Sequence, residues 1–206
     1  VLVIDDFSRG RPSHVPSEAI LLKQDLTEIP RHELARVISE FGADSIAHLA
    51  ATHFIPDCMA NPQRTLDVNT GITHTLIETL NLHPVERVVL ASTLDVYSNE
   101  DRCHHEGDAP APRNVYGLSK VLSEEVLAYG VRSGACRVGV VLRLANVYGP
   151  YETNPHLIPD VLRRLRRSNA PELAMGYVGG SRDFVFVADV AEALGRALTM
   201  PLEGFA

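Results

Sequence analysis

Short runs of apolar residues alternate along the chain with longer stretches in which apolar positions recur at helical spacing. Continuous runs rich in β-branched residues, such as RVVLAS and VGVVLR, are typical of parallel strands that are buried on both faces. The alternation predicts an α/β fold with a doubly wound parallel sheet, and ligands should bind at the carboxyl ends of its strands. The predicted strands are Val1–Asp5, Ala19–Leu22, Ser45–Leu49, Arg87–Ser92 and Arg137–Leu142, and the predicted helices are Arg31–Phe41, Asn61–Leu80 and Tyr116–Val131.

The alternation weakens after Pro150. We expect a helix at about Ile158–Arg167, a stretch interrupted by proline and glycine over Asn169–Ser181, a short strand in FVFV and a helix from Asp189. Residues 1–150 should therefore form the main domain. Residues 151–206 should form part of a smaller lobe, interleaved with the last elements of the main domain.

Composition narrows the range of functions. A formal net charge of -7 argues against nucleic acid as a partner, because a phosphate backbone calls for a basic face. No apolar run reaches the roughly 18 residues of a membrane span and the first residues do not resemble a signal peptide, so we expect a cytoplasmic protein. The basic sequence LRRLRR (162–167) is either a solvated helix face or a contact for an anionic substrate.

Cysteine and histidine patterns give no metal or redox site. The three cysteines are far apart, and the nine histidines lack the spacing of a metal-binding motif. We therefore expect no metal. His53 follows the run HLAA and could face a site there, but no role is assigned to it.

The strongest chemical signal is YGLSK, in which Tyr116 and Lys120 are four residues apart on a predicted helix. This spacing places the phenol and the ammonium on one face, where the cation should lower the tyrosine pKa toward working pH. A phenol tuned in this way can move a proton to or from a sugar hydroxyl or carbonyl. The alternative interpretation of the pair is a surface helix face.

A hydroxyl pair upstream supports the catalytic interpretation. Ser92 and Thr93 end a predicted strand in LASTLDVYS, about twenty residues before the tyrosine. A hydroxyl at the carboxyl end of a strand can hydrogen-bond the same substrate oxygen as the phenol. Either residue could instead cap backbone groups at the end of the strand.

Two carboxylates follow predicted strands. Asp5 ends the first apolar run, where a carboxylate can accept both hydroxyls of an adenosine ribose and disfavour a 2′-phosphate. Asp25, followed by Leu26, comes after the second strand, where an adenine could bind. An aspartate at such a place can also be a turn or cap residue.

A series of motifs resembles the extended short-chain dehydrogenase/reductases of the NAD-dependent epimerase/dehydratase family, which act on nucleotide sugars. The series covers almost the whole chain: VIDDFSRG, QDL, DSIAHLAA, NPQRTLDVN, ASTLDVYS, YGLSK, RLANVYGP and RDFVFVADV. The resemblance implies an NAD-binding Rossmann domain over residues 1–150, a small substrate lobe, and NAD that oxidises the sugar transiently. A Rossmann domain normally opens with a strand, a glycine-rich turn and a helix. This first βα unit is missing here, so we expect an unpaired sheet edge and weak NAD binding by these 206 residues.

The resemblance also implies roles for individual residues. Thr93, rather than Ser92, would be the catalytic hydroxyl, because it lies three residues before the valine of the VY pair. The catalytic set would be Thr93, Tyr116 and Lys120. The residues implied to bind NAD are Asp5, Asp25, Leu26, Leu49, Ala50, Ala51, Asn69, Tyr116 and Lys120. For Asn69, the alternative is a helix-interior amide that is bonded to backbone.

The residues implied to bind the sugar nucleotide are Thr93, Asn146 and Arg182. An arginine suits a diphosphate because its guanidinium can donate two charge-assisted hydrogen bonds. Arg182 could equally form a salt bridge with Asp183 or Asp189.

The resemblance favours an NAD-dependent nucleotide-sugar epimerase that acts through a transient keto-sugar. Related dehydratases carry Thr-Asp-Glu where this chain has Thr93-Leu94-Asp95, so one elimination acid is missing. A dehydratase, decarboxylase or reductase of the same family, or a catalytically silent binding protein, remains the alternative. The family also implies a homodimer formed by the helices at 61–80 and 116–131.

Overall fold

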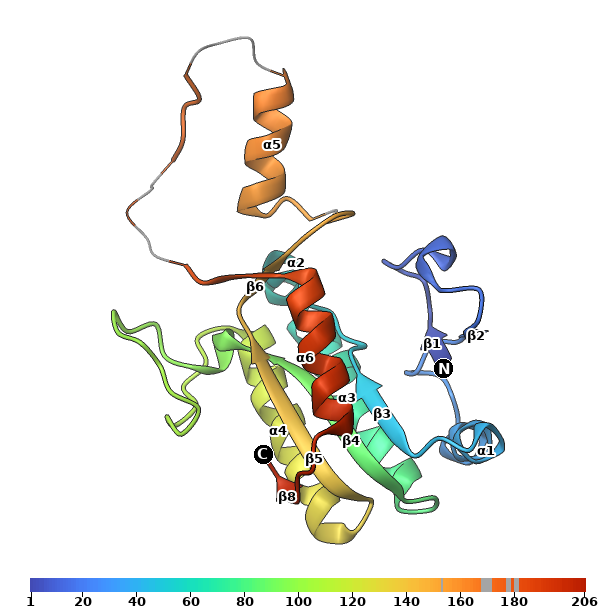
Figure 1. Ribbon diagram of the computed structural model, residues 1–206. Helices are drawn as coiled ribbons and strands as arrows, with labels where there is room; N and C mark the ends of the chain where they lie inside the picture. Colours follow the sequence, from blue (N-terminus) through green and yellow to red (C-terminus); the bar gives the residue numbers. More distant parts are fainter. Residues whose placement is uncertain (153, 168–171, 177–178, 180–181) are drawn as a thin grey trace.

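The computed structural model describes all residues except 153, 168–171, 177–178 and 180–181. The α/β prediction is confirmed, because four parallel strands form the central sheet in the order β3-β4-β5-β8 (Figure 1). The strands are β3 (Ser45–His48), β4 (Val85–Thr93), β5 (Cys136–Leu144) and β8 (Gly204–Phe205). Long apolar runs produce β4 and β5, whose register pairs Val89 with Val140.

Helices cover both faces of this sheet, as expected for a doubly wound fold (Figure 1). α1 (Arg31–Phe41), α3 (Pro62–Leu80) and α4 (Val115–Ser133) enclose the larger core, which includes Leu80, Leu90 and Leu127. α6 (Val187–Thr199) covers the opposite face over Val89 and Val138. The buried Arg87 of β4 donates a 2.6 Å hydrogen bond to the Ala197 carbonyl near the end of α6.

The first two strands form a separate parallel pair. β1 (Leu2–Asp5) pairs with β2 (Ile20–Lys23), after the short helix η1 (Pro12–His14), and this pair stands beside β3 in Figure 1. Within the described residues, β1 and β3 are each hydrogen-bonded to a neighbouring strand along one side only. The sequence predicted β1, β2 and β3. Because β1 and β3 are not paired with each other, these strands belong to two different sheets.

The remaining elements lie around the carboxyl ends of the strands. α2 (Ile55–Ala60) follows β3, η2 (Leu94–Val96) follows β4, and β6 (Asn146–Tyr148) pairs with β7 (Phe184–Phe186). α5 (Leu157–Arg167) stands apart from the sheet (Figure 1). The pattern predicted α5 and β7, missed α2, β6 and β8, and began the last helix two residues late. The stretch Asn169–Ser181 lies partly outside the described residues.

In the described part of the chain, none of the helices has the length and apolar character needed to cross a membrane.

Candidate active site at the carboxyl end of β4

The predicted catalytic residues come together where β4 meets α4. Thr93 is the last residue of β4, and its hydroxyl forms a hydrogen bond with the phenol of Tyr116 in the first turn of α4. One turn further along the helix, Lys120 Nζ donates a 2.8 Å hydrogen bond to the carbonyl of Ala91. All three side chains are therefore held by the same end of one strand, although their catalytic roles stay a prediction.

Local sequence features fix the start of α4 against this strand end. The Asn114 side chain caps the helix by accepting a 2.7 Å hydrogen bond from the amide of Gly117. Gly117 itself is packed against η2: a Cβ at this position would lie 2.2 Å from the Asp95 carbonyl oxygen. The Thr93 hydroxyl also caps η2 by accepting a 3.2 Å hydrogen bond from the amide of Asp95. Only glycine lets the helix approach this closely.

Burial dominates the electrostatics of the pair. Removal of the phenol from water raises the pKa of Tyr116 to about 12, and the charges of Asp95 and Cys58 also disfavour the phenolate, while the Thr93 hydrogen bond opposes the rise. Burial lowers the pKa of Lys120 to about 8, against the opposing charge of Glu124. The expectation that the cation lowers the tyrosine pKa is therefore wrong for this state of the protein. Desolvation outweighs the charge, and the ammonium is bonded to the Ala91 carbonyl.

The two candidate hydroxyls of β4 have different partners. Thr93 contacts the phenol, whereas the Ser92 hydroxyl donates a short hydrogen bond to the carboxylate of Glu124 on α4. Ser92 is thus engaged in the buried contact between strand and helix. This difference supports the choice of Thr93 over Ser92 as the hydroxyl that meets a substrate.

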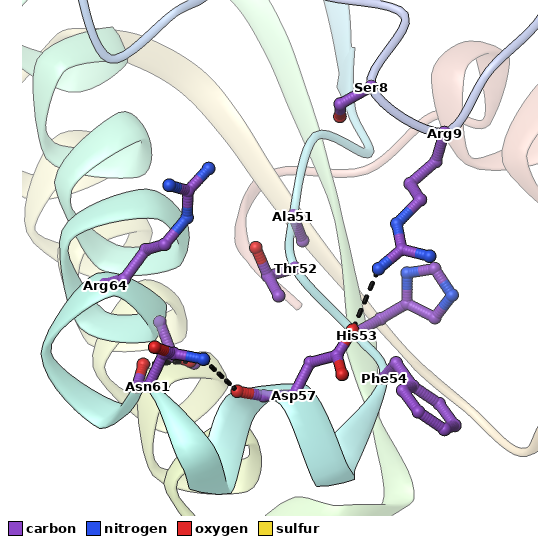
Figure 2. Close-up of a pocket in the computed structure, with 10 residues that line it drawn as sticks. Ser8, Arg9, Ala51, Thr52, His53, Phe54, Asp57, Asn61 and Arg64 are labelled. Carbon is purple, nitrogen blue, oxygen red and sulfur yellow. Dashed lines mark hydrogen bonds and ion pairs between the residues drawn. The ribbon is translucent and has the colours of Figure 1, made fainter.

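A cleft of about 400 Å³ lies at the carboxyl ends of β1 and β3 (Figure 2). Arg9, from the loop after β1, and Arg64, from α3, border it on opposite sides in Figure 2. Arg9 forms a 2.8 Å ion pair with Asp57 of α2. The other lining residues come from the same loops and helices: Ser8, Ala51, Thr52, His53, Phe54, Asn61 and Thr65.

Several residues predicted to bind a cofactor surround this cleft, although none of their roles is tested. Ala51 lines it directly, and Leu49 and Ala50 precede Ala51 in the same segment, with Leu49 53% exposed. Asp5 ends β1 and accepts a 2.6 Å hydrogen bond from the amide of Phe7, which has a positive φ of 57°. The carboxylate therefore organises the turn that carries Arg9 into the cleft.

Asp25 and Asn69 have extensive local bonding. Asp25 accepts hydrogen bonds from the amide and the hydroxyl of Thr27, and these bonds lower the pKa of Asp25. Leu26 packs against the larger core. The buried Asn69 accepts a 2.7 Å hydrogen bond from the amide of Thr52 and donates to the Thr52 carbonyl and the Ser119 hydroxyl. These contacts agree with the alternative interpretation of Asn69 and show how it shapes the loop that lines the cleft.

Two of the three predicted substrate residues, Asn146 and Arg182, are close neighbours in the fold. Asn146 begins β6 and donates its amide to the carbonyl of Asp183 at 3.3 Å, next to Arg182. A second cleft, of about 380 Å³, lies between the segment after β6 and the loop after β1, and it shares Arg9 and His53 with the first. The substrate roles of Asn146 and Arg182 stay predictions.

Sequence reasoning missed several residues that the fold brings to these sites. Arg9 and Arg64 lie within the quoted runs VIDDFSRG and NPQRTLDVN, but nothing in their spacing points to a common cleft. His53, left without a role, lines both clefts, and its Nε2 lies 2.9 Å from the side-chain nitrogen of Asn154. Glu124 could have been found, because it continues the four-residue spacing of Tyr116 and Lys120.

Comparison with known proteins identifies the family to which the chain belongs. The sequence profile described as the NAD dependent epimerase/dehydratase family matches residues 1–206. A UDP-glucose 4-epimerase of Corynebacterium glutamicum is 29% identical over 94% of this chain and 61% of its own length. A GDP-6-deoxy-D-mannose reductase of Pseudomonas aeruginosa is 33% identical over 76% of this chain and 54% of its own length.

The fold agrees with this likeness. The structure of a Thermus thermophilus UDP-glucose 4-epimerase in complex with NAD superposes with a TM-score of 0.82 at 29% identity, covering 99% of this chain and 68% of that one. The chain therefore spans a little over half to two thirds of the relatives it matches.

Proposed function

Because the chain belongs to the NAD-dependent epimerase/dehydratase family, whose cofactor is NAD, we propose that the protein is a nucleotide-sugar epimerase that acts through a transient keto-sugar. The observation that carries the proposal is the grouping of Thr93, Tyr116 and Lys120 at the carboxyl end of β4. A silent binding protein has no need for a phenol, a hydroxyl and a buried ammonium at one strand end. The proposal concerns the full-length protein, because the chain spans 61% of the Corynebacterium glutamicum relative.

The described residues fit a dinucleotide. A carboxylate ends β1, two guanidinium groups border the cleft, and the small side chain of Ala51 lets a ligand approach the backbone after β3. In this proposal Asp5 binds the adenosine ribose, Asp25 and Leu26 lie near the adenine, and Arg9 and Arg64 face the phosphates. NAD bound by these residues would supply reversible hydride transfer to and from the sugar.

The chain's own residues handle the proton. Tyr116 exchanges a proton with the sugar hydroxyl oxygen, and the Thr93 hydroxyl holds the same oxygen by a hydrogen bond. Lys120, anchored on the Ala91 carbonyl, keeps a positive charge near the phenol at neutral pH because its pKa is about 8. Since the pKa of Tyr116 is about 12 before ligands bind, the phenol rests protonated, and it can accept a proton only after ligand binding has lowered this pKa.

A reductase is the second candidate. The Pseudomonas aeruginosa relative that is 33% identical is a reductase, and a phenol that is protonated at rest is ready to donate to a keto oxygen. A dehydratase is less well supported, since Leu94 replaces one of the two elimination acids. The other acid, Asp95, accepts a 3.3 Å hydrogen bond from the side-chain amide of Asn114.

Two further proposals follow from the family and the fold. We propose that residues 1–150 form the NAD-binding domain and that residues 151–206 contribute to the substrate lobe, which the separate position of α5 supports. We also propose a cytoplasmic homodimer in which α3 and α4 meet their copies. Exposed apolar side chains at Leu118, Leu122 and Tyr129 lie on one face of α4 and support this contact.

The test uses the full-length protein and a panel of UDP-, GDP- and dTDP-sugars. We expect NAD to be bound on purification and NMR to show an epimerised sugar without net oxidation of added cofactor. Tyr116→Phe should lower the rate by at least about 100-fold because it removes the proton carrier. Tyr129→Phe, on the exposed face of the same helix, should not.

Each other outcome has a distinct meaning. One reduced cofactor consumed for every product formed would identify the reductase instead. A folded protein with neither bound cofactor nor product would contradict the proposal in favour of a silent binding protein.

A further inference from the structure

A buried carboxylate lies one helical turn beyond Lys120. Glu124 is on α4, 5% exposed, and continues the series Tyr116, Lys120, Glu124 at four-residue spacing. Residues so spaced share one face of a helix. Each contacts the same strand end: Tyr116 meets Thr93, Lys120 meets Ala91, and Glu124 meets Ser92.

Glu124 forms a salt bridge with a second, partly buried partner. Arg143 of β5 donates to its carboxylate through Nη2 at 2.7 Å and through Nε at 3.2 Å. The side chains of Glu124 and Arg143 are only 7% and 19% exposed, so water screens their charges weakly. The pair raises the pKa of Arg143 above its usual range.

Arg143 is itself fixed from the opposite side. Its Nη1 donates to the Tyr97 hydroxyl at 2.8 Å and to the Glu106 carbonyl at 3.0 Å. The guanidinium carbon lies 4.9 Å from the centre of the Tyr97 ring, and His104 stacks on that ring. Arg143 is therefore fixed in place, and it holds Glu124 toward the face of α4 that carries Lys120.

We propose that Glu124, fixed by Ser92 and Arg143 one helical turn beyond Lys120, is a positioning residue that keeps Lys120 charged. The catalytic importance of the Lys120 charge rests on the proposed function, but the charge itself can be measured independently of that function. Glu124 contacts neither the phenol nor the cleft, so its effect on chemistry passes through Lys120. The charge of Glu124 raises the pKa of Lys120, whereas burial lowers it, and this opposition supports the assignment.

Other ionisable groups face this region and must be held constant in any test. The groups around Lys120 and Glu124 are His48 at the end of β3, His53 after it, Tyr116 on the same helix and Arg143 on β5. Asp95 in η2 and Cys58 on α2 face the phenol. All of these residues remain in the protein when Glu124 alone is substituted.

The direct experiment measures the pKa of Lys120 by NMR of ¹³Cε-labelled lysine in the full-length protein. Lys23 and Lys120 are the two lysines of this chain, and the Lys120 signal is assigned by its loss in Lys120→Arg. Glu124→Gln keeps the size of the side chain and removes its charge. We expect the pKa of Lys120 to fall by about one unit, because the ammonium loses the carboxylate charge that opposes its burial, while the charge of Arg143 remains.

Glu125→Gln is the matched control, because Glu125 is the next residue, carries the same charge and is exposed. It should leave the pKa of Lys120 within about 0.2 units, since five residues along a helix place Glu125 on the opposite side of α4 from Lys120. The pH profile of kcat should shift in the same direction as the NMR titration in Glu124→Gln and should not shift in Glu125→Gln.

A second variant tests the proposal if Glu124→Gln by itself fails to fold. Glu124→Gln combined with Arg143→Met removes both charges of the buried pair, an exchange that proteins often tolerate. The pKa of Lys120 should fall here too, by less than in the single variant. An unchanged Lys120 pKa in either folded variant, or an equal shift in Glu125→Gln, overturns the proposal. An absence of catalysis with the expected pKa shift would count against the proposed function alone.

Discussion

At the scale of the residue, burial decides the charge states around α4. Tyr116 and Lys120 are both shifted toward their neutral forms, with pKa values of about 12 and 8. His48, buried at the end of β3, is shifted in the same sense: burial lowers its pKa to about 3, and the charge of Lys120 adds to the shift. Its Nε2 is 3.0 Å from the Thr73 hydroxyl.

His48 should therefore make stability depend on pH. Below its ordinary pKa of 6.5, the unfolded chain takes up a proton that the folded chain refuses until about pH 3. The free energy of unfolding should fall as pH drops from about 6.5, by at most about 1.4 kcal/mol per pH unit. Urea denaturation at intervals of roughly half a pH unit between pH 5 and pH 8 measures how the free energy of unfolding changes with pH.

The matched variants separate His48 from other titrating groups. His48→Gln keeps a polar partner for Thr73 and should flatten the slope below pH 6.5, whereas His32→Gln, at an exposed position of α1, should leave it unchanged. Identical pH dependence in wild type and His48→Gln would show that the histidine does not titrate as described.

At the scale of the element, the approach of α4 to η2 depends on a missing side chain. The start of α4 is fixed at this point, where the Asn114 side chain caps the helix and Gly117 packs against the Asp95 carbonyl. α4 then packs along α3, where Gly130 lies against Ile77. Glycine thus permits close packing at two points of one helix.

Gly117→Ala should be destabilising. Its Cβ would lie 2.2 Å from the Asp95 carbonyl oxygen, so the helix start or η2 must move, and we expect a loss of about 2–4 kcal/mol in the free energy of unfolding. Gly71→Ala in α3 is the control, because a Cβ at this position would lie 4.0 Å from the Leu66 carbonyl oxygen, an ordinary van der Waals distance. That change should be neutral or stabilising by up to about 1 kcal/mol. Equal losses in both variants would contradict the steric account.

At the scale of the whole molecule, the exposed apolar face of α4 is the feature that an assembly would cover. Leu118, Leu122 and Tyr129 are 42%, 39% and 52% exposed and lie on one side of the helix. Burial of such a stripe against its copy favours a symmetric dimer, in which each subunit presents the same surface.

Light scattering of the full-length protein should show a dimer at tens of micromolar. Leu122→Glu should shift it to monomer, because a charge in the centre of the contact would lose its water. Leu165→Glu, at an exposed leucine of α5, should leave the dimer intact. A wild-type protein that is monomeric at this concentration would contradict the dimer proposal.

The sequence by itself determined the α/β class, most strands and helices, and the pairing of Tyr116 with Lys120. These features depend on local periodicity and on spacing within one helix, which a sequence displays directly. It also singled out Thr93 through the family motif. It could not show the division of the strands into three sheets, because pairing depends on which edges meet in space.

Only the tertiary structure decided the electrostatics and the partners. Burial reversed the expected direction of the Tyr116 pKa, and desolvation is a property of the folded surroundings. The bonding of Asn69 to Thr52 and of Glu124 to Arg143 joins residues far apart in the chain. Sequence spacing fixes which side chains share an element, whereas the packing of elements fixes what each side chain meets and how much water reaches it.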